Sequence, residues 1–466
     1  MNIALFNIAD YHIPSEHPSL GLGYIASFLR KKSGIKEARV LAGNVLSQLE
    51  REPPDIIGIS SVTQDFPRAA QYAGFLKQKF RVPVIVGGVH ISSLPHRLPE
   101  AFDLAVLGEG EETIRELIET ISAWGWDEKR LALIKGIVYH QEGRVVVNPP
   151  RQIITDMDSI PFPVRSGFHR HGFFHILTSR GCPYRCSFCS SSRFWNKVRF
   201  FSAQYVIEEI LHLITDYKAR HISIWDDIFI ANLRRFREIV SLIRRKNIHR
   251  RISFGCSVRA NLVTEEVCSL MKQMNITHVD MGLESGSDRM LKFLKKDTVD
   301  VAANRRAVEQ LKQHGFVTRA SFIVGSPGET SEDMTQTLEF IKQSRLDGGV
   351  VNLAVPYPGT EFWQDASRRG LISEEMDFSR LAIVTRFSEL PADDFLLLSD
   401  KVTREEFLRI ARAIEFELAR RNTASLFSLK NLNFKNIRLA FLNPGLAIKI
   451  IRESFGGLKK RVKKNV

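Results

Sequence analysis

The segment Thr178-Ser-Arg-Gly-Cys182-Pro-Tyr-Arg-Cys186-Ser-Phe-Cys189 holds three of the five cysteines in this 466-residue chain. It follows an apolar run at 174–179 that is typical of a buried strand, so we expect the cysteines on a loop at the carboxyl end of that strand. Thiolates spaced C-x3-C-x2-C can bind three corners of a 4Fe-4S cluster and leave the fourth iron open. Zinc or structural thiols are the alternatives, but no further Cys or His with ligand spacing lies nearby.

The rest of the composition indicates an intracellular globular protein. Cys256 and Cys268 stand alone, so the cysteines do not form a disulfide framework. The chain is 44% hydrophobic and 25% charged, and it has no apolar run near the roughly 18 to 20 residues that cross a bilayer. No basic leader precedes the first apolar run, so we expect a cytoplasmic protein.

Residues 1–140 alternate short apolar runs with segments of helical spacing. This alternation predicts an α/β domain with a doubly wound, Rossmann-like parallel sheet, which binds ligands beyond the carboxyl ends of its strands. The expected strands are 2–7, 55–60, 82–87 and 104–108, and the expected helices are 21–31, 69–80 and 111–122.

A hairpin and a Pro-rich linker at 141–165 separate this domain from a second alternation at 166–365. Six strand–helix units there predict a partial (β/α)6 TIM-type barrel, and a mostly helical region follows at 366–466. The expected barrel strands are 174–179, 220–225, 252–257, 278–283, 318–324 and 349–355.

The cysteine motif and the strand ends together resemble the radical S-adenosylmethionine (SAM) superfamily over residues 165–365. Four strand-end motifs follow the cysteines in the family's order. They are Ile224-Trp-Asp226-Asp227, Met281-Gly-Leu-Glu284-Ser285, Ser321-Phe-Ile-Val-Gly325-Ser-Pro-Gly-Glu329 and Pro356-Tyr-Pro-Gly359. The resemblance implies that Cys182, Cys186 and Cys189 hold a catalytic 4Fe-4S cluster whose open iron binds SAM.

The same resemblance implies the contacts to SAM. Phe188 is expected near the adenine, and Glu284 and Ser285 near the ribose or methionine part. The remaining predicted contacts are Asp226, Arg259 and Gly325. Ion pairing within the protein is the alternative for Glu284 and Arg259, and helix capping is the alternative for Asp226.

Residues 1–140 resemble the cobalamin-binding domain that precedes the barrel in one class of this superfamily. The resemblance rests on Pro18-Ser-Leu-Gly21-Leu-Gly23-Tyr24, Val86-Gly-Gly-Val-His90 and Leu107-Gly-Glu-Gly-Glu111. It implies cobalamin contacts from Ser61, Val62, Gly87, Gly88, His90, Gly108 and Glu109. The pattern Asp-x-His-x-x-Gly is missing, so we expect no histidine of this domain on cobalt. A flavodoxin-like domain without the ligand is the alternative.

Transfer-RNA methylthiotransferases, which resemble this barrel, are disfavoured because they carry three further N-terminal cysteines, whereas this chain has no cysteine before Cys182. The net charge of +14 includes +6 from residues 447–466, which follow apolar positions in 433–451. This tail is interpreted as a packing helix with a basic end, or as a peripheral contact with anionic lipid on the inner face of the membrane. Nucleic acid is the least favoured partner.

The predicted activity is cobalamin-dependent methyl transfer to an unactivated carbon of a small-molecule, lipid or tetrapyrrole substrate. Radical cyclisation, rearrangement or carbon–carbon coupling without methyl transfer is the rival within enzymes. The alternative that is not an enzyme is a cluster- or cobalamin-dependent sensor, which binds its cofactor without turnover. As an enzyme, the protein would also need a low-potential electron donor such as a flavodoxin or ferredoxin.

Overall fold

The computed structural model describes residues 1–12, 19–33, 35, 37–165, 172–391 and 395–426. Two compact units divide the chain. The first comprises 1–256, 273–275 and 355–382, and the second comprises 257–272, 276–354 and 383–466. Within the described parts of the chain, every helix is too short or too polar to span a lipid bilayer.

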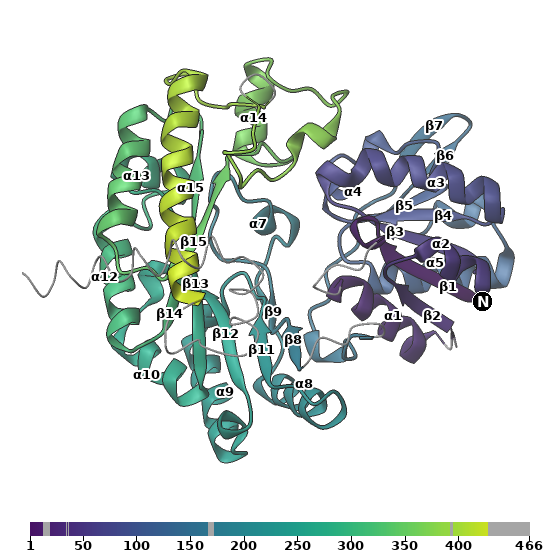
Figure 1. The fold of residues 1–466 in the computed structure, drawn as a ribbon. Helices are drawn as coiled ribbons and strands as arrows, with labels where there is room; N and C mark the ends of the chain where they lie inside the picture. Colours follow the sequence, from purple (N-terminus) through teal and green to yellow (C-terminus); the bar gives the residue numbers. More distant parts are fainter. Residues whose placement is uncertain (13–18, 34, 36, 166–171, 392–394, 427–466) are drawn as a thin grey trace, which may run out of the picture. The chain divides into compact units, whose positions relative to one another are not determined.

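The first unit begins with a seven-stranded sheet in the order β2-β1-β3-β4-β5-β6-β7 (Figure 1). Its first five strands in this order are parallel, and β1 lies between β2 and β3, so the chain winds outward in both directions from β1. This confirms the predicted doubly wound, Rossmann-like domain. The parallel strands are β1 (Asn2–Asn7), β2 (Glu37–Leu41), β3 (Ile56–Ser60), β4 (Val84–Gly87) and β5 (Leu104–Val106).

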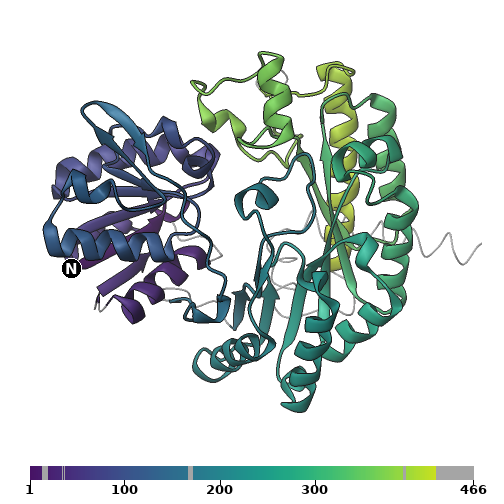
Figure 2. The same cartoon turned by 180° about the vertical axis from the view of Figure 1, so that it is seen from behind.

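Helices cover both faces of this sheet, as Figures 1 and 2 show. One apolar core joins the sheet to α1 (Leu20–Lys32) and α5 (Glu111–Trp124). A second core joins the other face to α2 (Val45–Arg51), α3 (Phe66–Phe80) and α4 (Val89–Ser93). Because both faces are buried, β1, β3, β4 and β5 are mostly apolar runs, which is why the sequence could predict them.

The hairpin belongs to this first sheet, which therefore extends past residue 140, the predicted end of the domain. Strand β6 (Ile137–Gln141) pairs antiparallel with β5, and β7 (Arg144–Val147) pairs with β6. Its turn, Glu142-Gly143, has φ of 49° and 73°, the left-handed backbone of a tight hairpin turn. The hairpin satisfies backbone groups of β5 that would otherwise form an exposed sheet edge.

The six strands predicted after the linker all form. In the first unit β8 (Phe173–Ile176), β11 (His221–Ile224) and β12 (Ser253–Val258) are parallel neighbours. Helices α8 (Ala203–Asp216) and α9 (Leu233–Arg245) alternate with them, and each begins at a side-chain cap, from Ser202 and Asn232 respectively.

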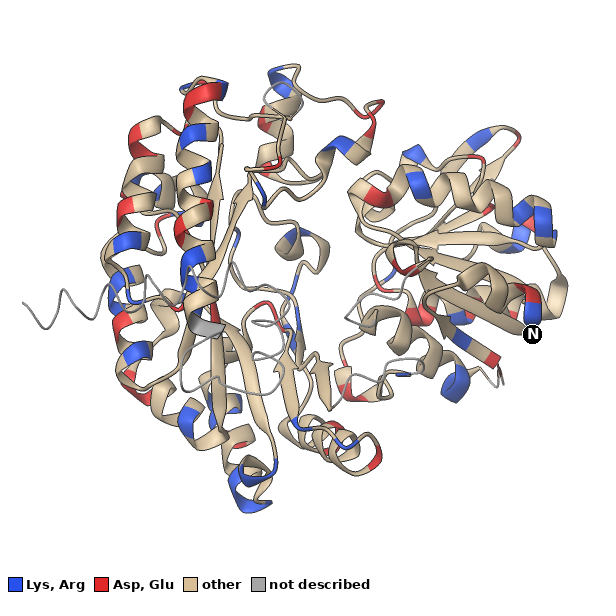
Figure 3. Cartoon of the chain, viewed as in Figure 1, with Lys and Arg blue, Asp and Glu red and all other residues tan. Residues whose placement is uncertain are grey.

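In the second unit β13 (Ile276–Glu284), β14 (Val317–Val324) and β15 (Gly348–Leu353) run parallel. The C-terminal helix α15 (Arg404–Leu426) packs against β15 and α13 (Ser331–Gln343), as predicted for a helical C-terminal region. Figure 3 shows charges of both signs along α13 and α15. The basic tail lies outside the described residues. The other helices here are α10 (Glu265–Met274), α11 (Asp288–Lys295) and α12 (Val301–Gln313).

Candidate active site

The cysteine loop is closed at its base by two short strands. Strand β9 (Ser179–Arg180) pairs antiparallel with β10 (Arg199–Phe200), so residues 181–198 form a loop between them. Gly181 has φ of +92°, and a Cβ there would lie 2.9 Å from the Lys197 carbonyl oxygen. Only glycine fits this turn, which directs the chain from the strand into the cysteine motif.

All five cysteines are free thiols, and Cys186 is buried while Cys182 and Cys189 are half-buried. Burial raises the pKa of Cys182 to about 11, and a hydrogen bond from the backbone of Tyr184 opposes this rise. Burial likewise raises the pKa of Cys189, opposed mainly by the backbone of Ser191. Thiols in such surroundings become thiolates when a metal binds, and backbone hydrogen bonds to sulfur are a usual feature of iron–sulfur sites.

The spacing of these thiols matters for the choice of metal. Among the described residues, no three His, Cys, Asp or Glu side chains come close enough together to hold a single metal ion. The ground for a cluster stays the motif itself, three thiols at C-x3-C-x2-C spacing with no further Cys or His at ligand spacing nearby.

Asp226 holds the start of the cysteine loop. Its Oδ1 accepts hydrogen bonds from the backbone N–H of Thr178 (2.5 Å) and Ser179 (3.2 Å). Its Oδ2 accepts from the hydroxyls of the same two residues, at 2.5 and 2.6 Å. Asp227 accepts a hydrogen bond from the Ser191 hydroxyl, on the other side of the cysteines. Phe188 is half-buried, and its ring centroid lies 6.3 Å from that of Phe362.

In the second unit, the predicted SAM residues already have partners within the protein. Glu284 has φ of 68°, and its carboxylate forms an ion pair with Lys295 (3.0 Å). The alternative given for Glu284, an ion pair within the protein, is therefore realised with a lysine. The Ser285 hydroxyl lies 3.2 Å from that of Thr337, and Arg259 donates to the hydroxyl of Thr298. Their contacts to SAM stay predictions.

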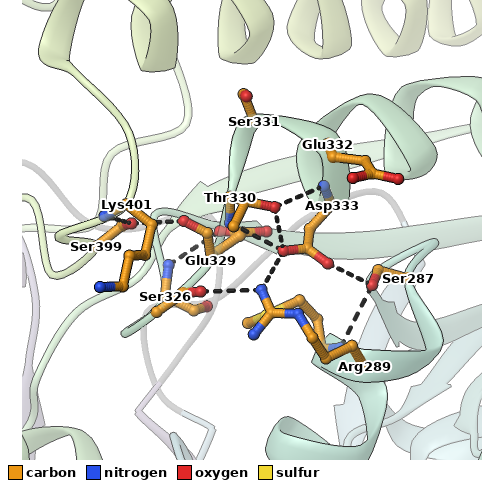
Figure 4. Close-up of polar contacts among 12 residues, drawn as sticks. Ser287, Arg289, Ser326, Glu329, Thr330, Ser331, Glu332, Asp333, Ser399 and Lys401 are labelled. Carbon is orange, nitrogen blue, oxygen red and sulfur yellow. Dashed lines mark hydrogen bonds and ion pairs between the residues drawn. The ribbon is translucent and has the colours of Figure 1, made fainter.

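Gly325 ends β14 with φ of +80°, and a Cβ there would lie 3.1 Å from Leu353, Leu397 and Phe407. Its N–H donates to Oε2 of Glu329 (2.5 Å), and the N–H of Ser326 donates to the same oxygen (3.0 Å; Figure 4). Glu329 is fully buried, and among the described residues its Oε1 has no hydrogen-bond partner. We did not select Glu329 as a site residue from the sequence, although the spacing Gly325-Ser-Pro-Gly-Glu329 contained the signal.

Small residues at the strand ends of the first sheet surround a partly open pocket of about 70 Å³. Gly58, Gly87, Gly88, Gly108 and Gly110 line it together with apolar side chains of β1, α1 and α5. A Cβ on Gly110 would lie 2.8 Å from Cδ1 of Ile25, and one on Gly88 only 2.2 Å from the Ser61 carbonyl oxygen. The pocket thus exists because side chains are missing, and its apolar walls suit a flat ring such as the base of a cobalamin nucleotide tail.

Comparison with known proteins identifies two domains in this chain. Residues 176–341 match the radical SAM superfamily, and residues 8–118 match the B12-binding domain. An uncharacterised methyltransferase of Pyrococcus horikoshii is 34% identical over 372 residues, which are 76% of this chain and 80% of the relative. This chain belongs to the cobalamin-binding class of the radical SAM superfamily.

Two further proteins are similar to this radical SAM enzyme. An anaerobic magnesium-protoporphyrin IX monomethyl ester cyclase of Rubrivivax gelatinosus is 26% identical over 427 residues, covering 85% of this chain and 75% of the relative. The radical SAM methyltransferase TsrM of Kitasatospora setae, solved with cobalamin and a [4Fe-4S] cluster, shares the fold with a TM-score of 0.67. It is 19% identical, with 78% of this chain and 76% of that chain covered. The cofactors are therefore a 4Fe-4S cluster, SAM and cobalamin, and the enzyme needs a substrate and an electron donor.

Two of the predicted cobalamin contacts have surroundings that the sequence did not indicate. His90 is 1% exposed, and its ring lies between those of Phe66 (4.0 Å) and Phe378 (4.5 Å), not in the lining of the glycine pocket. Burial lowers the pKa of His90 to about 4, so the ring is neutral. Glu109 is held by arginines of the cysteine loop. Ser61 is buried, and Val62 is 37% exposed at the end of β3.

Replacing Asp226 by alanine is expected to lower the free energy of unfolding of this radical SAM enzyme. Two buried N–H groups would lose their acceptor, at a cost of about 1–3 kcal/mol. Iron retained after cluster reconstitution should fall as well, because Thr178 and Ser179 lead into the cysteine loop. Urea unfolding and iron analysis measure both, with the exposed Asp216→Ala as the control. Unchanged stability and iron content would contradict the role assigned to Asp226.

Glu329 predicts a pH dependence of stability. Burial raises its pKa from 4.5 to about 8, opposed by hydrogen bonds from the backbone of Ser326 and Gly325. Between pH 4.5 and about pH 8, Glu329 therefore keeps its proton in the folded protein but has lost it in the unfolded chain. This contribution to stability is full below about pH 4.5 and is lost as the pH rises through about 8.

Urea unfolding from about pH 5 to about pH 9 should therefore show the wild type losing stability relative to Glu329→Gln, which keeps an acceptor but cannot ionise. The exposed Glu332→Gln, on the first turn of α13, should follow the wild type at every pH. Parallel pH profiles of the wild type and Glu329→Gln would contradict a proton on Glu329.

Proposed function

We propose that this enzyme transfers a methyl group from SAM to an unactivated carbon of its substrate, with cobalamin as the methyl carrier. The proposal rests above all on a cysteine loop fit for a cluster and a glycine-lined pocket fit for a corrinoid in one chain. The similarity to the Pyrococcus horikoshii methyltransferase supports this choice of reaction.

Within this proposal each site residue has a role. A bound cluster would supply the electron for cleavage of SAM to a 5′-deoxyadenosyl radical, and a bound cobalamin would supply the methyl group. Cys182, Cys186 and Cys189 hold the cluster, and Asp226 fixes the loop that carries them. The predicted SAM contacts are Phe188, Asp226, Arg259, Glu284, Ser285 and Gly325.

The glycines and short side chains at the strand ends of the first sheet would hold the corrinoid. Gly87, Gly88 and Gly108 let it approach the backbone, and Val62 offers it an apolar surface. Nε2 of His12 is 2.5 Å from the Tyr72 hydroxyl, and His90 is enclosed by two phenylalanine rings. Both rings thus have partners within the protein, and in this proposal neither His12 nor His90 binds cobalt.

Ring formation without methyl transfer is the second candidate function. It is favoured by the similarity to the Rubrivivax gelatinosus cyclase, which covers 85% of this chain. The name of the Rubrivivax gelatinosus relative, a magnesium-protoporphyrin IX monomethyl ester cyclase, also supports a tetrapyrrole among the candidate substrates. A lipid-like substrate and a membrane contact through residues 433–466 stay part of the proposal, as does a flavodoxin or ferredoxin as the electron donor.

The reconstituted, corrinoid-loaded enzyme should be given SAM with a deuterated methyl group, a low-potential reductant and candidate tetrapyrrole or lipid substrates. Methyl transfer predicts S-adenosylhomocysteine and 5′-deoxyadenosine in similar amounts, and a deuterated methyl group in the product. Formation of 5′-deoxyadenosine with an unlabelled, altered product would instead assign cyclisation or coupling. Corrinoid binding without either nucleoside product, across the substrates, would assign the sensor.

A further inference from the structure

Four buried charged side chains join the cysteine loop to the corrin-binding domain of the same unit. Arg180 and Arg199 are paired across the β9–β10 ladder at the base of the cysteine loop. Glu109 lies in the turn after β5, and Glu111 is the first residue of α5. None of these side chains is more than 7% exposed. We call this group the charge anchor.

Short ion pairs hold the charge anchor together, and Nε of Arg199 is buried without a hydrogen-bond partner among the described residues. Arg180 binds Glu109 through Nη1 (2.6 Å) and Glu111 through Nη2 (2.5 Å). Arg199 binds both oxygens of Glu109, at 2.7 and 3.0 Å. Burial alone would raise the pKa of Glu109, but the hydrogen bonds and charges of Arg199 and Arg180 lower it below its usual value. The two positive and two negative charges cancel, so the group is buried without a net charge.

Neighbouring groups fix the charge anchor further. The guanidinium carbon of Arg180 lies 5.3 Å from the ring centroid of Tyr24 in α1 and 5.5 Å from that of Trp195 in the cysteine loop. The N–H of Ile154, in the linker, donates to Glu109 (3.0 Å), and its carbonyl accepts from Arg199 (2.5 Å). Corrin domain, linker and cysteine loop therefore meet at this group.

We propose that Glu109, Glu111, Arg180 and Arg199 are positioning residues that set where the cluster-bound SAM lies relative to the corrinoid. The proposal rests on methyl transfer between these two cofactors, which tolerates only small errors of placement. Both oxygens of Glu109 are engaged by arginines, so this residue acts on the corrinoid through the cysteine loop and not by direct contact.

Hydrogen–deuterium exchange of the full-length protein tests the link between the two segments. Glu109→Gln is expected to increase exchange in residues 104–118 and in residues 178–200 together. Glu119→Gln, which alters an exposed ion pair with Arg115 on α5, is the matched control and should change neither. Arg199→Lys, which keeps the charge balance but not the paired hydrogen bonds, should increase exchange in both segments and serves if Glu109→Gln does not fold.

A second readout tests the consequence for the cofactors. Loaded with hydroxocobalamin and given SAM and a low-potential reductant, Glu109→Gln should keep its iron and corrinoid. Its ratio of S-adenosylhomocysteine to 5′-deoxyadenosine should fall at least about tenfold, because misplacement slows methyl transfer more than SAM cleavage.

Increased exchange confined to 104–118, or loss of corrinoid while exchange in 178–200 is unchanged, would overturn the proposal and make Glu109 a direct corrin contact. A wild-type protein that forms no S-adenosylhomocysteine would overturn both methyl transfer and the proposed role in placing the cofactors. The exchange pattern would then still decide whether the charge anchor links the two segments.

Discussion

Cys186→Ala is expected to lower formation of 5′-deoxyadenosine from SAM by more than about 100-fold, because even groups that only support a metal ligand cost about 10–100-fold when removed. Cys186 is the most buried of the three cysteines and lies midway in the motif, so no other thiol can take its place. The measurement is chromatography of the nucleoside products after anaerobic reconstitution, together with iron and sulfide analysis.

The control for this variant is Cys268→Ala. Cys268 is fully buried in α10 and belongs to the second unit, outside the cysteine motif. Its replacement should leave iron content and 5′-deoxyadenosine formation close to the wild-type values. Equal losses in both variants would show that the effect comes from unfolding, and retention of the cluster in Cys186→Ala would refute the assigned ligand set.

Gly87→Val is expected to weaken corrinoid binding at least about tenfold, since overfilling a packed site costs about 1–3 kcal/mol. Gly87 ends β4 and lines the glycine pocket, and its Cβ would meet nothing nearer than the Val106 carbonyl oxygen at 3.6 Å. The Cβ of a valine at position 87 therefore fits without a clash, and its two methyl groups would occupy the pocket. Titration with hydroxocobalamin followed by gel filtration and absorbance measures the retained corrinoid.

Gly74→Val is the matched control for the pocket. Gly74 lies in α3, and a Cβ there would meet only Ala101, at 4.0 Å. This variant makes the same chemical change in the same domain, away from the glycine pocket, and should bind corrinoid as the wild type does. Full corrinoid retention by Gly87→Val would mean that the glycine pocket is not the corrin site.

The sequence predicted the features that depend on local spacing. The cysteine motif, the glycines at the strand ends and all six strands after the linker follow from residue types a few positions apart. The elements that we did not predict are short. Strand β2 lies at a sheet edge, and Glu37 and Arg39 interrupt its apolar residues, so it lacks the apolar run that marks the other strands. Helix α4 has five residues, which is too few to show a helical period.

Partners distant in the chain could not be predicted in this way. The resemblance to the cobalamin-binding domain predicts Glu109 as a corrin contact, but the arginines that bind it are 71 and 90 positions away. The carboxylate of Asp226 is occupied by residues 48 and 47 positions earlier. Only the folded chain shows that these carboxylates are already bonded, since a sequence pattern does not record which buried charges meet.

The central claim is that one chain binds a 4Fe-4S cluster and a corrinoid and uses the cluster to cleave SAM. The most direct test is a single preparation of the anaerobically reconstituted protein loaded with hydroxocobalamin. Iron, corrinoid and, after addition of SAM and reductant with candidate substrates, 5′-deoxyadenosine would be quantified in the same sample. We predict one cluster and one corrinoid per chain together with 5′-deoxyadenosine. A protein that retains neither cofactor, or that retains both and never cleaves SAM, would contradict the account.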